Sequence, residues 1–173
     1  MALLDIVLYP DEILRMESSE VDVFDDDLKK LVNDMAETMY DAPGIGLAAP
    51  QVNINKKIIV VDIGSDEETQ RVGQLYTLIN PKIVESSGFI KYEEGCLSIP
   101  GVREFVERPS NVKVEAQDET GKQIKVEAEG LLAVCLQHEI DHINGTLFID
   151  HLSGLKKKLA NKKLIKMFGT SKG

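Results

Sequence analysis

The sequence contains little cysteine: Cys96 and Cys135 are too few for a disulfide framework. A chain of 173 residues can bury a sizeable core without such bridges, so we expect free thiols in a reducing compartment. The first residues, Met1 to Asp5, lack both the basic start and the cleavage site of a signal peptide. No apolar run approaches the roughly 20 residues that span a membrane. These absences predict a cytoplasmic protein without a membrane segment.

Acidic residues are absent from the segment after Asp150, although the whole sequence has a net charge of −9. This segment contains seven lysines, from Lys156 to Lys172. The asymmetry fits two interpretations equally well. The basic tail, residues 154–173, can have a polyanionic partner, or it can form a solvated helix face that balances an acidic body. The sequence has no repeat and no linker, so residues 1–173 are expected to form a single domain.

Apolar periodicity predicts three helices. Asp25, Asp26 and Asp27 supply an N-cap and favourable charge at the start of the first helix, over 27–40. The second is expected over 130–144, before the stop signal Asn144-Gly145. The third is expected over 153–168, with these residues largely on one side: Leu155, Leu159, Leu164, Ile165 and Phe168.

Apolar runs and alternating patterns predict the strands between these helices. A buried strand is expected over 57–63, a polar loop over 64–74, and two strands separated by Pro81, over 75–80 and 82–92. Alternation predicts antiparallel strands over 102–106, 111–116 and 123–128, with a turn at Thr120-Gly121. The predicted fold class is α+β, with antiparallel or mixed strands packed around a central helix over 130–144.

The segment GIGLAAPQ at 44–51 contains G-x-G-x-x-A, a variant of the dinucleotide-binding fingerprint. That fingerprint needs a strand before it and a helix that opens on it. Here a predicted helix comes first and Pro50 follows, so we expect no nucleotide cofactor. Glycines in this arrangement suit an extended loop whose backbone passes close to a ligand.

The strongest chemical signal is HExxH, formed by His138, Glu139 and His142 within the predicted helix over 130–144. Residues four apart lie on the same face of a helix, so the two imidazoles can bind one metal ion. The carboxylate between them can act as the general base of a metal-dependent hydrolase. A buried helix whose histidines only form hydrogen bonds is the structural alternative.

A catalytic metal site usually has three protein ligands, so a third ligand must lie elsewhere. Position 148 is Phe where metzincins have histidine, and no glutamate follows Glu139, which argues against a thermolysin-like site. The candidates are His151, Cys96 and Cys135. Cys135 lies too far along the helix to share an ion with His142, so we expect it to line the pocket. Cys96, in a short segment bounded by Gly95 and Pro100, is favoured over a surface-lying His151.

Three segments considered together resemble the motifs of the peptide deformylase family in order and spacing: GIGLAAPQ at 44–51, EGCLSIP at 94–100 and QHEIDHINGTLF at 137–148. The likeness extends over nearly the whole chain. It implies removal of the N-formyl group from formyl-methionine at the start of nascent polypeptides. It also implies that Cys96, His138 and His142 bind one metal ion, with water in the fourth position.

The resemblance further implies Fe²⁺ as the native ion, with Ni²⁺, Co²⁺ or Zn²⁺ able to replace it. Ligand types alone do not make that choice, because a Cys-His-His set suits zinc equally well. Glu139 is expected to be the general base and acid. By the same resemblance, the Leu97 backbone N–H and the Gln51 side-chain amide would stabilise the oxyanion.

Substrate selection is expected from the helix face beside His138. A pocket for an unbranched methionine side chain is predicted from these residues: Leu131, Val134, Cys135, Ile45 and Tyr92. The backbone from Gly44 to Gly46 can pair with an extended peptide. Arg103 is expected to contact that peptide, and Glu94 is also assigned to substrate binding. Core packing for Leu131 and Val134, and a surface charge for Arg103, are the structural alternatives.

The sequence leaves three other functions open. HExxH alone would also fit a zinc peptidase that cleaves internal amide bonds. Cys96 as a nucleophile would make the protein a cysteine hydrolase, with a covalent acyl-enzyme and no sensitivity to chelators. A structural metal combined with the lysine-rich tail would fit a non-enzymatic module that binds the ribosome, whose RNA-rich surface is also the polyanionic partner expected for a deformylase.

Overall fold

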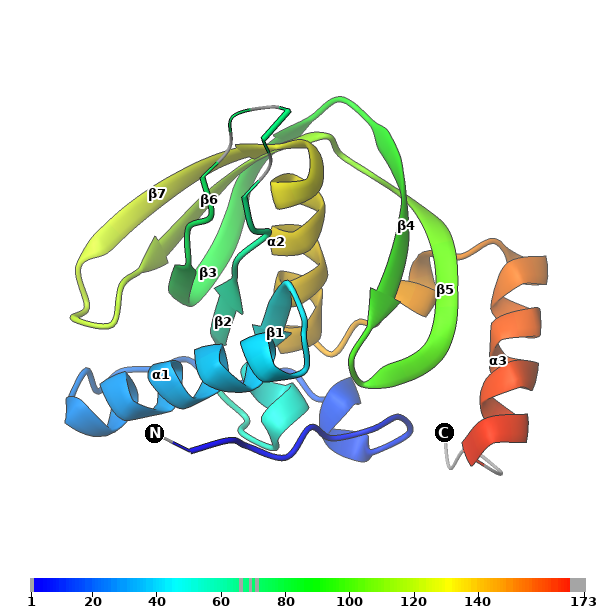
Figure 1. Cartoon of the computed structure of the whole chain (residues 1–173), viewed down its shortest axis with the longest axis horizontal. Coiled ribbons are helices and arrows are strands. Elements are labelled where there is room, and N and C mark those ends of the chain that lie inside the picture. Colours follow the sequence, from blue (N-terminus) through cyan, green and yellow to red (C-terminus); the bar gives the residue numbers. More distant parts are fainter. Residues whose placement is uncertain (1, 66, 69, 71, 169–173) are drawn as a thin grey trace.

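The computed structural model describes residues 2–65, 67–68, 70 and 72–168; parts of the predicted 64–74 loop and the end of the basic tail, including Lys172, lie outside them. Five strands form an antiparallel sheet in the order β1-β2-β3-β6-β7. A separate antiparallel pair, β4-β5, lies beside the sheet (Figure 1). The strands are β1 (Gly46–Ala48), β2 (Ile58–Val61), β3 (Tyr76–Ser87), β4 (Ile90–Cys96), β5 (Ile99–Arg108), β6 (Asn111–Gln117) and β7 (Gln123–Glu129).

Three α-helices accompany these strands: α1 (Asp26–Asp41), α2 (Gly130–Ile143) and α3 (Gly154–Phe168). Three short 3-10 helices complete the fold: η1 (Glu12–Arg15), η2 (Ala49–Val52) and η3 (Phe148–His151). In Figure 1, α2 stands between the sheet and the β4-β5 pair, α1 crosses the lower front, and α3 lies at the far side of β5. The predicted α+β class is therefore confirmed.

Helix α2 is buried on most of its surface because it contacts both groups of strands. One core cluster joins Leu136, Ile140 and Ile143 of α2 to the sheet residues Ile59 and Val114. At roughly 25 cal/mol per Å² of apolar area, this burial supplies the main force that holds the helix in place. A polar side chain on such a helix is therefore enclosed by protein.

Helix α1 begins as its sequence predicts, with the Asp25 side chain accepting a hydrogen bond from the Leu28 backbone N–H at 3.0 Å. Its buried face, including Met35 and Met39, packs with Leu47 and Ile58 of the sheet. The helix ends at Asp41, just before the segment 42–45 that leads into β1. Packing of α1 thus positions the segment 42–45, which precedes β1.

The separation of strands at Pro81 is wrong. Strand β3 continues through Pro81, with irregular pairing to β6 between Ile79 and Lys82. The chain reverses at Gly88, whose φ is +70°, so the predicted strand over 82–92 is divided between β3 and β4. A proline fits within a strand at a bulge, where its missing N–H removes no ladder hydrogen bond. The end of β3 is therefore set by its pairing with β6, a contact between segments that are distant in the sequence.

The predicted apolar side of the last helix is correct only in part. Leu164 is buried as expected, together with Ala160, whereas Leu155 and Leu159 are 71% and 57% exposed. Ile165 is exposed as well, and the Phe168 side chain lies outside the described part. Alanine therefore occupies the packing position that the pattern assigned to leucine. None of the helices in the described part of the chain has the length and apolar content that a membrane span requires.

Candidate metal centre

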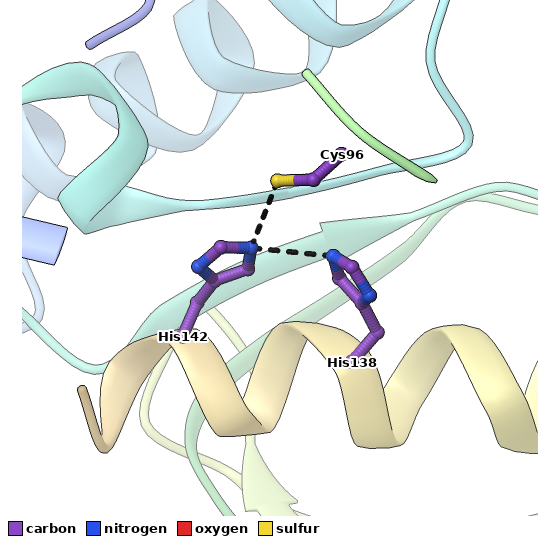
Figure 2. A group of neighbouring side chains, drawn as sticks. All are labelled: Cys96, His138 and His142. Carbon is purple, nitrogen blue, oxygen red and sulfur yellow. Dashed lines mark hydrogen bonds between the residues drawn. The ribbon is translucent and has the colours of Figure 1, made fainter. Parts of the chain in front are cut away.

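The two histidines of HExxH lie side by side on α2, as their spacing predicts. The Nε2 atoms of His138 and His142 are 3.2 Å apart, and both side chains are buried (Figure 2). Phe148 of η3 stacks on the His138 ring with centroids 6.0 Å apart. The residue in the metzincin histidine position is therefore a packing neighbour of the histidine pair.

Cys96, at the end of β4, brings the third candidate ligand atom to this pair. Its Sγ lies 3.3 Å from His142 Nε2 (Figure 2). Ligand atoms of Cys96, His138 and His142 all lie within 4.8 Å of one another, and among the described residues this is the one group found that could hold a metal ion. His151 lies elsewhere, with Nε2 2.8 Å from Asp141 Oδ2.

The charges around the three atoms suit a bound cation. Burial alone would lower the pKa of His138, but the surrounding anionic groups, led by Glu139, outweigh it and raise that pKa well above its usual range. Burial and the neighbouring His138 lower the pKa of His142, so its imidazole is neutral and offers a lone pair. A thiolate with two imidazoles is a donor set that zinc and iron both accept. The residues present therefore fit a divalent transition metal.

Glu94 holds the outer nitrogen of His138. Its Oε1 lies 2.9 Å from His138 Nδ1, an arrangement that orients a metal-binding histidine. Burial alone would raise the pKa of Glu94, but hydrogen bonds from His138 and Arg108 outweigh it and lower that pKa. Glu94 is predicted to bind substrate, but both its oxygens are engaged by His138 and Arg108, which favours a role in orienting His138.

Arg108 and Asp141 extend this network, and the sequence analysis did not identify either residue. Arg108 donates to both oxygens of Glu94, at 2.6 and 2.9 Å, and to Asp141 Oδ2 at 2.9 Å. All three residues are largely buried, so the guanidinium supplies the positive charge that the two carboxylates need. Arg108 ends β5 and Asp141 lies inside HExxH, but no local pattern in the sequence connects them.

Glu139 faces the cavity beside the three candidate ligands. Its Oε1 is buried and has no hydrogen-bond partner in the described part of the chain. Burial raises the pKa of Glu139 to about 7, and the neighbouring His138 partly opposes that shift. A carboxyl group that titrates near neutrality can both accept and return a proton.

Gln51 and Leu97 approach the site from two other segments. Gln51 is buried in η2; its Nε2 lies 3.5 Å from Cys96 Sγ and donates to Ser98 Oγ at 3.2 Å. Its Oε1 accepts from the Ala48 backbone N–H at 2.9 Å, which sets the amide orientation. Leu97 lies in the turn between β4 and β5 and lines the same cavity. Buried Ser98 is a neighbour that sequence reasoning missed.

A cavity of about 410 Å³ opens beside this cluster. It is lined by every residue assigned to substrate binding: Gly44, Ile45, Gly46, Tyr92, Glu94, Arg103, Leu131, Val134 and Cys135. Burial raises the pKa of Cys135, which keeps its thiol neutral and apolar. Arg103 pairs with Glu93 at 3.0 Å, exposed to solvent. Two larger grooves on the sheet, of about 720 and 620 Å³, contain none of the candidate ligands.

The sequence and the fold match known proteins closely. Residues 3–158 match the polypeptide deformylase family. The peptide deformylase of Hydrogenovibrio crunogenus is 55% identical over 163 residues, which are 94% of each chain. A solved peptide deformylase from Legionella pneumophila has a TM-score of 0.86 at 47% identity and covers 95% of both chains. The Ehrlichia chaffeensis enzyme, solved in complex with actinonin, has a TM-score of 0.88 at 44% identity over 98% of this chain and all of that one.

These matches cover the three motif segments and nearly all of the fold around them. The chain belongs to the peptide deformylase family, hydrolases that remove the N-formyl group from peptides.

Proposed function

We propose that this protein hydrolyses the formyl amide of formyl-methionine at the start of nascent polypeptides and releases formate. The observation that carries this proposal is the meeting of Cys96, His138 and His142 at the edge of a cavity that Cys96, His138 and Glu139 line. Family membership supports the reaction class. We also propose that it acts in the cytoplasm, where nascent chains are made.

Cys96, His138 and His142 would hold one divalent ion, and we propose Fe²⁺, with Ni²⁺, Co²⁺ or Zn²⁺ able to replace it. Such an ion supplies Lewis-acid chemistry: it polarises a carbonyl oxygen and lowers the pKa of water at its open position. Glu94 orients His138 through its Nδ1 atom, while Arg108 keeps Glu94 ionised. The protein thereby fixes the geometry of the site before substrate arrives.

Glu139 is the proposed general base. Its carboxylate takes a proton from water as the water oxygen attacks the formyl carbon. It then delivers that proton to the departing amine when the C–N bond breaks. A pKa near 7 suits both steps, because the group is readily protonated and readily deprotonated at neutral pH.

Gln51 and Leu97 are the proposed donors to the oxygen that becomes negative in the transition state. The Gln51 amide is fixed by Ala48, so little reorganisation is needed as charge develops. Removing one such donor typically costs about 10²–10³ in kcat. The Leu97 backbone N–H, in the turn that follows Cys96, would act with it.

The methionine side chain would enter the apolar part of the cavity, formed by Leu131, Val134, Cys135, Ile45 and Tyr92. The backbone of Gly44 to Gly46 would pair with the peptide, and Arg103 would contact it at the solvent-exposed rim. Formyl-Met and formyl-Glu peptides compared at equal concentration test this pocket. Equal efficiency on both would contradict it.

We further propose that the lysines of α3 bind the RNA-rich surface of the ribosome. Lys157, Lys158, Lys162, Lys163 and Lys166 are exposed on this helix. Basic side chains bind phosphate in a salt-dependent way. This contact would place the enzyme where formylated chains emerge.

The deciding experiment measures formate released from a formyl-Met peptide, with metal analysis under anaerobic conditions. Deformylation requires formate release, no cleavage of unformylated peptide, and loss of activity with a chelator. Cleavage of internal bonds would instead indicate a zinc peptidase, and a chelator-resistant acyl-enzyme would indicate a cysteine hydrolase. Glu139→Gln should retain metal and lose about 10²–10⁴ in rate; near-full turnover would remove Glu139 from its role.

A further inference from the structure

A hydrogen-bonded pair outside the metal centre joins α1 to the end of β2. The Tyr40 hydroxyl, in the last turn of α1, donates to Asp62 Oδ2 at 2.6 Å. Asp62 follows β2 directly, and its Oδ1 accepts from the Gly64 backbone N–H at 2.9 Å. Tyr40 is half-exposed, and its partial burial together with the bond to Asp62 raises its pKa to about 12, so the hydroxyl remains a donor. An O–H donor to a carboxylate is among the stronger hydrogen bonds in proteins.

The same aspartate also holds the segment that connects α1 to β1. The Asp62 backbone N–H donates to the Ile45 carbonyl at 2.9 Å, next to the β1-β2 ladder. At the other end of the segment, the Gly44 backbone N–H donates to the Met39 carbonyl at 2.7 Å. Residues 42–45 are therefore fixed at their two ends, and the Tyr40–Asp62 bond ties those two ends together.

This connection forms one wall of the substrate cavity. Pro43, Gly44, Ile45 and Gly46 line it, together with residues of the β4-β5 pair. Pro43 and Ile45 are exposed, so the wall has few buried contacts of its own. Segments with little buried apolar surface open at low cost in free energy. The position of this wall therefore depends on the bonds at its ends.

We propose that the Tyr40–Asp62 pair positions the cavity wall formed by residues 43–46, and that Tyr40 thereby controls how tightly the formylated peptide binds. Tyr40 is a positioning residue: it lines no part of the cavity and acts through Asp62 and Ile45. This inference rests on the proposed deformylation. It concerns substrate affinity, because the proposed proton transfer belongs to Glu139 on another element.

Tyr40→Phe removes one oxygen atom and keeps the ring, so it tests the bond alone. We expect KM for a formyl-Met tripeptide to rise about three- to tenfold, with kcat changed less than about twofold, the size of one hydrogen bond's effect. A formyl-Met amide without further residues should show a smaller rise in KM, because it pairs less with the wall. Tyr76→Phe is the matched control, since Tyr76 lies in a separate groove between α1, β3 and β7, and should leave KM unchanged.

Hydrogen exchange of the amides at 44–46 gives a second measurement that needs no turnover. Exchange should be faster in Tyr40→Phe and unchanged in Tyr76→Phe. Asp62→Asn keeps the backbone bond to Ile45, but its single side-chain oxygen must serve both the Tyr40 hydroxyl and the Gly64 N–H. The bond to Tyr40 is then weakened, so KM should lie between wild type and Tyr40→Phe. If Tyr40→Phe changed neither the exchange rates at 44–46 nor KM, the inference would be overturned. A fall in kcat as large as the rise in KM would overturn it as well. If the wild type released no formate, but exchange at 44–46 were still faster in Tyr40→Phe than in the wild type, the proposed function would be refuted. The positioning role of Tyr40 would remain.

Discussion

At the scale of single residues, Gly46 and Glu139 compete for the same small volume. A Cβ atom on Gly46 would lie 2.5 Å from Glu139 Oε2 and 2.9 Å from its Cδ, closer than atoms approach without displacement. Glycine at this position therefore leaves room for the Glu139 carboxylate. This reason was not visible in the sequence, because the two residues are far apart in the chain.

Gly46→Ala should displace the Glu139 carboxylate and lower kcat by about 10–100-fold, since a shift of about 1 Å can cost that much. Metal content should remain at the wild-type level, because the three atoms nearest to the added Cβ all belong to Glu139. Gly154→Ala is the control: a Cβ there meets nothing within 4 Å. Wild-type kcat in Gly46→Ala would show that the carboxylate has space to move without loss.

The raised pKa of Glu139 also predicts how stability varies with pH in metal-free protein. Its folded pKa is about 7 against an ordinary 4.5, so the neutral carboxyl stabilises the fold below pH 4.5 and this contribution is lost as the pH rises through 7. As the pH rises from about 5 to about 8, the free energy of unfolding of the chelator-treated wild type should fall by about 2–3 kcal/mol relative to that of Glu139→Gln. Denaturant unfolding of both proteins at each pH measures the difference; parallel curves would contradict it.

At the scale of elements, helices were predicted better than strands for a physical reason. The 3.6-residue period and the aspartate cap lie within α1, and the HExxH spacing lies within α2, so local sequence contains both signals. The path of β3 through Pro81 depends on its pairing with β6. The buried face of α3 depends on its packing against β5. Arg108 reaches Glu94 and Asp141 across three elements, a contact that no local pattern encodes.

Arg108 is therefore the place to test how the elements are held together. Arg108→Met would leave the buried Glu94 carboxylate without its main partner, and breaking such a pair typically costs about 3–5 kcal/mol. Loss of the His138 orientation should also weaken metal binding by about 10–100-fold. Arg103→Met, which breaks the exposed pair with Glu93, should cost less than about 1 kcal/mol.

Denaturant unfolding and metal titration of the two variants provide the comparison. If Arg108→Met were as stable as Arg103→Met, the network from Glu94 to Asp141 would have no structural importance. If stability fell but metal affinity did not, Glu94 would hold His138 without help from Arg108. Stability and metal affinity measured together thus distinguish a role of Arg108 in folding from a role in orienting the metal ligands.

At the scale of the whole molecule, segments far apart in the chain meet at the metal centre, and the N-terminal segment crosses them. The Val7 backbone N–H donates to the Gln51 carbonyl at 2.6 Å, and the Tyr9 N–H donates to the Ser98 carbonyl at 2.8 Å. The Ser18 N–H donates to the Ile143 carbonyl at the end of α2, at 2.8 Å. Each motif segment is thus bonded to the same stretch of backbone, which couples folding of the site to folding of the chain.

Charge is also unevenly divided at this scale, since α3 contains six lysines and no acidic residue, whereas all 29 acidic residues lie before it in the chain. Removing the helix is a poor test of its function, because Ala160 and Leu164 belong to the core cluster around Leu14 and Phe148. Lys156 is a poor choice as well, since it lies 3.8 Å from Glu104. The exposed lysines further along α3 can be neutralised without disturbing that packing.

Replacing Lys157, Lys158 and Lys162 by glutamine should therefore weaken ribosome binding and leave formate release from a short peptide unchanged. The slope of log affinity against log salt should become shallower by about 0.7–0.9 for each phosphate that the variant no longer neutralises. The control replaces three exposed lysines outside α3, Lys82, Lys91 and Lys122, which changes net charge equally. Equal weakening in both variants would mean that overall charge drives the binding. Unchanged affinity and slope in the α3 variant would reject the docking role, because lysines that bind phosphate cannot be removed without releasing fewer counterions.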